Sequence, residues 1–103
     1  MNLTSKKRAF LKKKAHNLDA ICRIGKDGFS ETLAQGVLDA ITPRELIKVK
    51  ILQNSEVEKR EVAFQIAEAI DAQVVDIIGR TIILFKENQD KPTEISLELK
   101  GIK

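Results

Sequence analysis

The stretch ELIKVKIL, residues 45–52, constrains the fold more than any other part of this 103-residue chain. Apolar and basic side chains alternate along it. Three apolar residues take one side and two lysines take the other: Ile47, Val49 and Ile51 against Lys48 and Lys50. Because successive side chains of a β-strand point to opposite faces, this alternation predicts a strand with one buried face and one basic face.

Helices are predicted on both sides of a first short strand, because apolar residues recur there at helical spacing. The first helix is expected to begin at Thr4 or Ser5 as its N-cap and to end at about His16. The second is expected to begin at Ser30 as its N-cap and to stop before Pro43, since proline cannot continue a helix.

The second half of the chain favours one more helix and two strands. Residues 54–71 predict a helix whose acid-rich start suits the positive end of the helix dipole. Residues 73–86 predict two strands joined at Gly79–Arg80, because a Gly-X pair between apolar runs is typical of a type II′ hairpin turn. With a strand at residues 20–25, the order α-β-α-β-α-β-β predicts an α/β layered fold, a mixed four-stranded sheet packed with helices.

The last part of the chain is polar. From Glu87 onward polar residues dominate, and Pro92 lies among them. We therefore expect a single domain over residues 1–90, followed by a polar C-terminal tail over residues 91–103. The apolar piece ISLEL within this tail is expected either to add a short edge strand or to pack against the domain.

The basic residues are distributed unevenly. Residues 1–50 contain eleven Lys or Arg and five Asp or Glu, whereas residues 51–103 contain seven and ten. Six bases precede the first acidic residue: Lys6, Lys7, Arg8, Lys12, Lys13 and Lys14. This asymmetry indicates a basic face and an anionic partner, with ordinary solvated charge as the competing interpretation.

The residue types needed for catalysis or metal binding are scarce. His16 is the only histidine and Cys22 the only cysteine, which excludes an internal disulfide and a metal site built on paired histidines or cysteines. A thiol in an apolar strand is more often buried and inert than nucleophilic. The chain is therefore interpreted as a non-enzyme that uses no cofactor and no metal.

The chain has neither Trp nor Tyr and only four Phe. A contact with nucleic acid would therefore depend on charge, backbone amides and shape rather than on an aromatic stacking platform. No stretch approaches the roughly 20 apolar residues of a membrane helix, and the lysine-rich start lacks the apolar run of a signal peptide. We expect a cytoplasmic monomer that does not enter a membrane.

The stretch RIGKDGFSE, residues 23–31, raises the question of a phosphate site. It contains G-x-x-G at Gly25 and Gly28, without the longer glycine patterns of nucleotide-binding loops. A helix N-terminus after the loop would favour an anion, and Lys26 would add positive charge. Asp27 opposes an anion, and an Asp-Gly pair is common in turns. Taken alone, the loop is best interpreted as a tight strand-to-helix turn.

The surroundings of the loop strengthen the case for an anion. If the apolar strand residues pack under the helices, Arg23, Lys48 and Lys50 share the opposite face of the sheet. Together with Lys26, Arg80 at the hairpin turn and the bases of the first helix, they would form one continuous basic surface.

Four segments in unbroken order resemble a known family: LTSKKRAFLKKKAHNL, RIGKDGFSE, ELIKVKIL and VVDIIGRTIILFK. The chain resembles the CRM domain, and in particular the stand-alone bacterial YhbY-type proteins, over about residues 2–86. The resemblance implies an RNA-binding domain with a fold similar to the C-terminal domain of translation initiation factor 3. It also implies association with precursors of the large ribosomal subunit.

The resemblance further implies a set of RNA-binding residues, with the G-x-x-G loop acting like the loop by which KH domains clamp a nucleic-acid backbone. The expected set combines four loop residues with seven surrounding bases: Gly25, Lys26, Asp27, Gly28, Lys6, Lys7, Lys13, Arg23, Lys48, Lys50 and Arg80. The expected partner is structured ribosomal RNA of the large subunit or a pre-ribosomal particle, contacted mainly through its phosphates.

The alternative hypothesis is a protein-interaction module. Its helical face would dock a ribosomal protein or an assembly factor, and ISLEL could contribute by strand addition. The basic surface would then be ordinary solvated charge.

Overall fold

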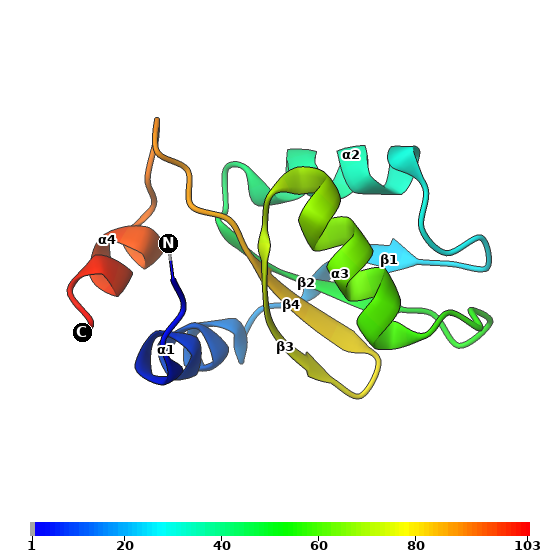
Figure 1. Ribbon diagram of the computed structural model, residues 1–103, viewed down its shortest axis with the longest axis horizontal. Helices are drawn as coiled ribbons and strands as arrows, with labels where there is room; N and C mark the ends of the chain where they lie inside the picture. Colours follow the sequence, from blue (N-terminus) through cyan, green and yellow to red (C-terminus); the bar gives the residue numbers. More distant parts are fainter. Residues whose placement is uncertain (1) are drawn as a thin grey trace.

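A computed structural model describes residues 2–103, so that Met1 of the predicted domain lies outside the described range. Within this range, four helices and four strands follow one another along the chain. They are α1 (Ser5–Ala15), β1 (Ala20–Ile24), α2 (Glu31–Ile41), β2 (Leu46–Ile51), α3 (Lys59–Ile70), β3 (Gln73–Ile78), β4 (Thr81–Phe85) and α4 (Glu94–Lys100). The predicted order of three helices and four strands is present, and α4 follows it (Figure 1).

The strands form one mixed sheet in the order β1-β2-β4-β3. β1 and β2 run parallel, and β4 pairs antiparallel with both β2 and β3. Parallel neighbours need a crossover connection, and α2 supplies it. Figure 1 shows α2 and α3 together beside the sheet, whereas α1 and α4 lie together at the left of the view. The predicted α/β layered fold with a mixed four-stranded sheet is confirmed.

One face of the sheet packs against α2 and α3 and forms the first core. Ile47, Val49 and Ile51 of β2 are each at most 1% exposed, and Ile82 and Leu84 of β4 lie beside them. The two helices contribute residues at helical spacing: Ala34, Val37, Ile41, Val62, Ala63, Ile66, Ala67 and Ile70. Each fully buried aliphatic side chain contributes about 1.5–3 kcal/mol, so the alternation of β2 is enforced by this core.

The opposite face of the sheet holds a second core, which the alternation of β2 did not predict. Leu46 and Phe85 are buried there against Leu11 and Ala15 of α1 and Leu99 of α4. β4 is therefore buried on both faces, which explains the four consecutive apolar residues IILF that follow Thr81. α1 and α4 cover the end of this face at which β2 begins and β4 ends. The other end, which bears the strand bases, is left open.

Polar side chains set the starts of the helices. Thr4 and Ser30 cap α1 and α2, and each side chain accepts a hydrogen bond from the backbone N–H three residues later, at 3.2 and 3.0 Å. α3 begins at Lys59, five residues later than predicted, because Glu58 is its N-cap. The Glu58 carboxylate accepts two first-turn N–H groups at 2.8 and 3.1 Å, and these bonds lower its pKa.

The segment ISLEL lies in α4, so the expected edge strand is wrong, and the alternative of packing against the domain is correct. Thr93 is the N-cap of α4. Ser96 and Leu99 on the inner side of the helix are completely buried. The C-terminal segment therefore completes the second core beside α1.

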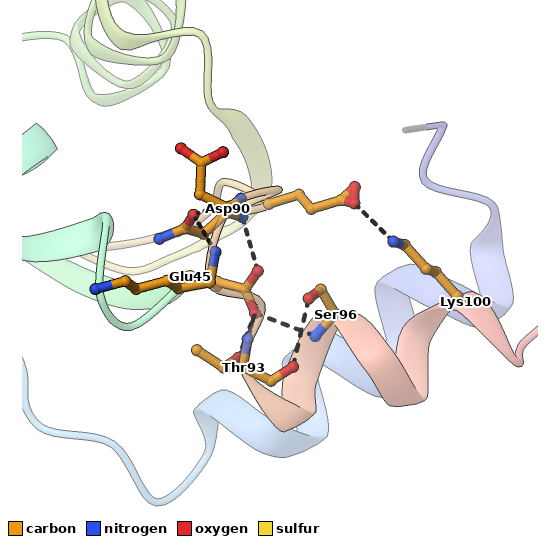
Figure 2. A network of polar contacts seen from close by, with 8 residues as sticks. Glu45, Asp90, Thr93, Ser96 and Lys100 are labelled. Carbon is orange, nitrogen blue, oxygen red and sulfur yellow. Dashed lines mark hydrogen bonds and ion pairs between the residues drawn. The ribbon is translucent and has the colours of Figure 1, made fainter.

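Glu45 anchors this segment from within the domain (Figure 2). Its side chain is completely buried, and its backbone has a positive φ of 67°. The carboxylate accepts hydrogen bonds from the backbone N–H groups of Asn88 (2.7 Å), Thr93 (3.0 Å) and Ser96 (3.2 Å), and from the Thr93 hydroxyl. Burial would raise the pKa of Glu45, but these hydrogen bonds outweigh burial and keep the pKa below its ordinary value.

Candidate nucleic-acid interface

The G-x-x-G loop is a tight turn between β1 and α2. The N–H of Gly28 donates to the carbonyl of Gly25 at 3.2 Å. Gly28 has a positive φ of 65°, and a Cβ there would lie 2.7 Å from Cγ1 of Val57. Gly25 has no positive φ, and a Cβ there would meet nothing within 4 Å. The fold therefore requires the second glycine and leaves the first without a structural reason.

The two charged residues at the tip of the loop are free to act on a ligand. Lys26 and Asp27 are exposed, and neither side chain has a hydrogen bond or ion pair within residues 2–103. The loop runs directly into the capped N-terminus of α2, where the helix dipole favours an anion. Lys26 can therefore reach an anion at the loop without breaking a contact of the fold.

Three bases form a strip on the open part of the sheet. Arg23 of β1 and Lys50 of β2 are direct partners in the parallel ladder, and both are exposed. Lys48 lies two residues earlier on the same face, and its Nζ donates to the carbonyl of His16 at 3.3 Å. We call Arg23, Lys48 and Lys50 the sheet strip. It joins the C-terminal end of α1 to the G-x-x-G loop, which begins where the strip ends.

Arg80 occupies the β3–β4 turn but directs its guanidinium inward. Nε donates to the carbonyl of Ile51 at 3.1 Å, and Nη2 donates to the carbonyls of Leu52 and Ser55. The preceding Gly79 has a φ of 59°, as the predicted hairpin turn requires. Arg80 thus ties the hairpin to the segment after β2 with three of its five N–H donors, and Nη1 has no hydrogen-bond partner within residues 2–103.

The six bases of α1 divide into a free group and an engaged group. Lys6, Lys7 and Lys13 have side chains without a hydrogen bond or ion pair in the described part of the chain. The Nζ of Lys14 pairs with Glu98 of α4 at 3.2 Å. The three free lysines of α1 are the three that the sequence analysis placed in the RNA-binding set.

Arg8 and Lys12 are engaged by an irregularity of β3. The ladder between β3 and β4 shifts register between Val74 and Asp76, which marks a β-bulge at Val75. The guanidinium of Arg8 donates to the carbonyls of Val74 and Val75 at 2.6 and 2.7 Å. The Nζ of Lys12 pairs with Asp76 at 3.2 Å. Sequence reasoning missed both contacts because neither partner lies near α1 in the chain.

The structure places the candidate residues along the long dimension of the molecule, which measures 40 Å. In Figure 1 the loop between β1 and α2 lies at the right end of the view and α1 lies at the lower left. The sheet strip lies between them, so the bases of α1 and the loop are connected through Lys48 rather than in direct contact. Lys48 and Arg80 have engaged head groups, and the other six bases of the set have no side-chain partner within residues 2–103.

The two residues considered for nucleophilic chemistry lie in ordinary environments. Cys22 is half-buried beside the first core. Burial raises the pKa of its thiol against the smaller opposing effects of Arg44 and Arg23. His16 is exposed at the C-terminal cap of α1. Residues 2–103 contain no cluster of three His, Cys, Asp or Glu side chains arranged to hold a metal ion. No helix in this range has the length and apolar character to span a bilayer.

Proteins with known sequences or structures are similar to this chain. A protein of Bacillus subtilis named "Probable RNA-binding protein YqeI" is 41% identical over 88 residues, covering 85% of this chain and 92% of its own length. A protein of Methanocaldococcus jannaschii, also named as a probable RNA-binding protein, is 37% identical over 84% of this chain and 66% of its own length. The solution structure of a Staphylococcus aureus protein has a TM-score of 0.71 and 38% identity, covering 89% of this chain and all of that one.

The sequence model of the CRS1/YhbY (CRM) domain family matches residues 3–86. These residues span α1 to the end of β4 and include the G-x-x-G loop and the sheet strip. The match leaves out α4 and the segment that Glu45 anchors. Because the family model matches most of the chain, and because relatives share its sequence and fold, the chain belongs to the CRS1/YhbY (CRM) domain family.

Proposed function

We propose that this protein binds structured RNA through the G-x-x-G loop, the sheet strip and the free lysines of α1. Family membership and the names of its relatives support this proposal. The observation that carries it is a set of six bases whose head groups have no partner within residues 2–103: Lys6, Lys7 and Lys13 on α1, Arg23 and Lys50 in the sheet strip, and Lys26 in the loop. Such a surface is suited to phosphates, which provide most of the affinity in nucleic-acid binding.

The proposed RNA is ribosomal, and the proposed setting is the assembly or maturation of the large subunit in the cytoplasm. This part of the proposal follows from the resemblance to YhbY-type proteins. The RNA-binding unit is residues 1–90, acting as a monomer and a binding protein rather than an enzyme. Because the sequence has no Trp or Tyr and only four Phe, selectivity would come mainly from RNA shape and 2′-hydroxyl groups.

The test is binding to large-subunit ribosomal RNA fragments across a salt series. Lys26→Glu is compared with Lys91→Glu, which makes the same charge change at an exposed position in the C-terminal segment. We expect steep salt dependence for the wild type, and Lys26→Glu should weaken binding and flatten the slope of log affinity against log salt by about one or more. Equal effects of the two variants would remove the loop from the interface.

Protein docking remains the second candidate, and one observation favours a surface for it. Phe64 on the outer side of α3 is 52% exposed and is the one aromatic side chain among the exposed large hydrophobic residues of the described range. Docking by strand addition through ISLEL is no longer available, because that segment is helical. Ribosome association that survives nuclease and high salt but is lost in Phe64→Ser would support protein docking, whereas release by nuclease would support RNA binding.

A further inference from the structure

A groove separates α1 from the open part of the sheet. Its volume is about 850 Å³, within the range of roughly 300–1,000 Å³ found for pockets that hold small ligands. We call it the α1 groove and define it by Phe10 and Lys13 on the helix side and by Lys48, Ile78 and Ile83 on the sheet side. The sequence analysis did not predict it, because it depends on the angle at which α1 crosses the sheet.

The sheet side of the groove presents apolar surface to solvent. Ile78, the last residue of β3, is 56% exposed, and the buried Ile83 lies on the same face of the neighbouring strand. Phe10 is half-buried at the edge of the second core and forms the facing wall. A planar ligand can therefore lie between an aliphatic floor and an aromatic edge.

The rim of the groove is positively charged and preformed. The ion pairs of Lys12 with Asp76 and of Lys14 with Glu98, both at 3.2 Å, connect α1 to β3 and to α4. Lys13 lies on the rim with a free head group. Among the described lining residues, Glu98 is the single acid against four lysines. Since Lys12 and Lys14 are paired with acids, Lys13 and Lys48 carry the uncompensated positive charge of the rim, which favours an anionic ligand.

We propose that the α1 groove binds one unpaired nucleotide of the RNA, with its base on Ile78 and Phe10 and its phosphate near Lys13 and Lys48. Lys48 belongs both to the sheet strip and to the groove. An RNA backbone that follows the strip therefore reaches the groove without interruption. The RNA bound at the strip then supplies the nucleotide that binds in the groove. This inference rests on the proposed function of the protein.

The proposal specifies what kind of RNA is preferred. The Nζ of Lys14 lies 5.6 Å from the ring centroid of Phe10 and covers part of that ring. The base then contacts mainly an aliphatic surface, which discriminates weakly between the four bases. A fully paired helix keeps its bases stacked and cannot use the groove. The groove therefore selects a helix with a nucleotide that is already unstacked, whatever its base.

The experiment compares two RNA hairpins that differ only in one bulged nucleotide. Dissociation constants are measured at one fixed salt concentration for the wild type, Ile78→Ala and the control Leu97→Ala. Leu97 on α4 is 58% exposed, so the control removes a similar apolar side chain outside the groove. We expect the wild type and Leu97→Ala to prefer the bulged RNA by about fivefold, and Ile78→Ala to lose most of that preference. Affinity for the fully paired hairpin should be unchanged in all three.

A second variant tests the groove even where Ile78→Ala does not fold. Ile78→Trp enlarges the stacking surface and should increase the preference for the bulged RNA. A bulged 4-thiouridine should crosslink on irradiation to the peptide that contains Phe10 or to the one that contains Ile78.

Equal affinity of the wild type for both hairpins, or a crosslink confined to the G-x-x-G loop, would overturn the groove proposal and leave RNA binding intact. Binding of neither hairpin would overturn the proposed function itself.

Discussion

Gly28 faces Val57 so closely that a Cβ on the glycine would lie 2.7 Å from Cγ1 of the valine. The second glycine of the G-x-x-G loop is therefore a requirement of packing and of a positive φ. The first glycine, Gly25, has open space around it. The question whether this loop is a turn or a phosphate cradle thus has a separate answer for each glycine.

Gly28→Ala should lower the free energy of unfolding by about 1–2 kcal/mol. The alanine backbone would be strained at this positive φ, and its Cβ could not avoid Val57 unless the valine moved. Gly25→Ala should change stability by less than about 0.5 kcal/mol, yet weaken RNA binding if the backbone of the RNA approaches this position. Urea denaturation and RNA binding of both variants provide the test. Comparable stability losses would contradict the assignment of Gly28 to the fold.

Glu45→Gln should loosen the C-terminal segment. The amide keeps the shape of the side chain but loses the negative charge, and its NH2 group cannot accept the hydrogen bonds that the carboxylate receives. The expected loss is about 2 kcal/mol. Hydrogen exchange at the backbone amides of Thr93 and Ser96 should accelerate, with Glu94→Gln on the exposed first turn of α4 as the matched control. Unchanged protection of both amides would show that the packing of Leu99 alone holds α4.

Acid should release the same anchor. The pKa of Glu45 is held below the ordinary value of about 4.3. Since the folded pKa is lower than the unfolded one, the stabilisation is complete above the unfolded value and is lost as the pH falls through the folded one. The stability of the wild type should therefore decrease more steeply below about pH 4.3 than that of Glu45→Gln. The lowered pKa of Glu58 acts in both proteins and cannot produce a difference between them. Parallel acid-unfolding curves would therefore contradict a contribution of Glu45 to the acid sensitivity of the fold.

Local sequence patterns predicted the parts of the fold that depend on neighbours in the chain. Thr4 and Ser30 are the caps of their helices, because a hydroxyl before an apolar periodic segment acts within three residues. The alternation of β2 placed Lys48 and Lys50 on one face for the same reason. Glu58 was overlooked as a cap, although its carboxylate offers the same acceptor to the N–H groups of α3.

The second core was missed because its parts are distant in the sequence. Leu46 shares a face with Lys48 and Lys50 but is covered by helices from the two ends of the chain. One local signal was available: the sequence TIILF is apolar at both alternating sets of positions, which indicates burial on both faces. The ion pair of Lys12 with Asp76 carried no such signal, because a β-bulge decides the direction of Asp76. The candidate site was therefore predicted as a list of bases, while their division into free and engaged groups required the fold.

Glu98→Gln should strengthen RNA binding. The change removes the acid that pairs with Lys14 and frees that lysine for phosphate. Because both side chains are well exposed, the stability cost should stay below about 1 kcal/mol. Affinity should rise about two- to threefold at low salt, and the salt slope should steepen by up to about one. Glu68→Gln on the exposed side of α3 makes the same charge change away from the basic surface and should have no comparable effect. Equal gains in both variants would reflect net charge alone.

Arg80 and Lys50 lie at the same end of the sheet and should respond to substitution in opposite ways. Arg80→Gln removes donors from the carbonyls of Ile51, Leu52 and Ser55, which should lower the free energy of unfolding by about 1–3 kcal/mol. Lys50→Gln removes an exposed, free head group, so stability should change by less than about 0.5 kcal/mol.

For RNA binding the order should reverse. Lys50→Gln should weaken it about three- to tenfold and reduce the salt slope by about one, because one phosphate contact is lost. Arg80→Gln should have a smaller effect at temperatures well below its unfolding midpoint, because three of the five N–H donors of Arg80 are already used by the protein. Thermal unfolding and salt-dependent binding, measured on both variants, separate the two roles. A larger binding loss in a folded Arg80→Gln than in Lys50→Gln would mean that Arg80 leaves its three carbonyls to meet the RNA.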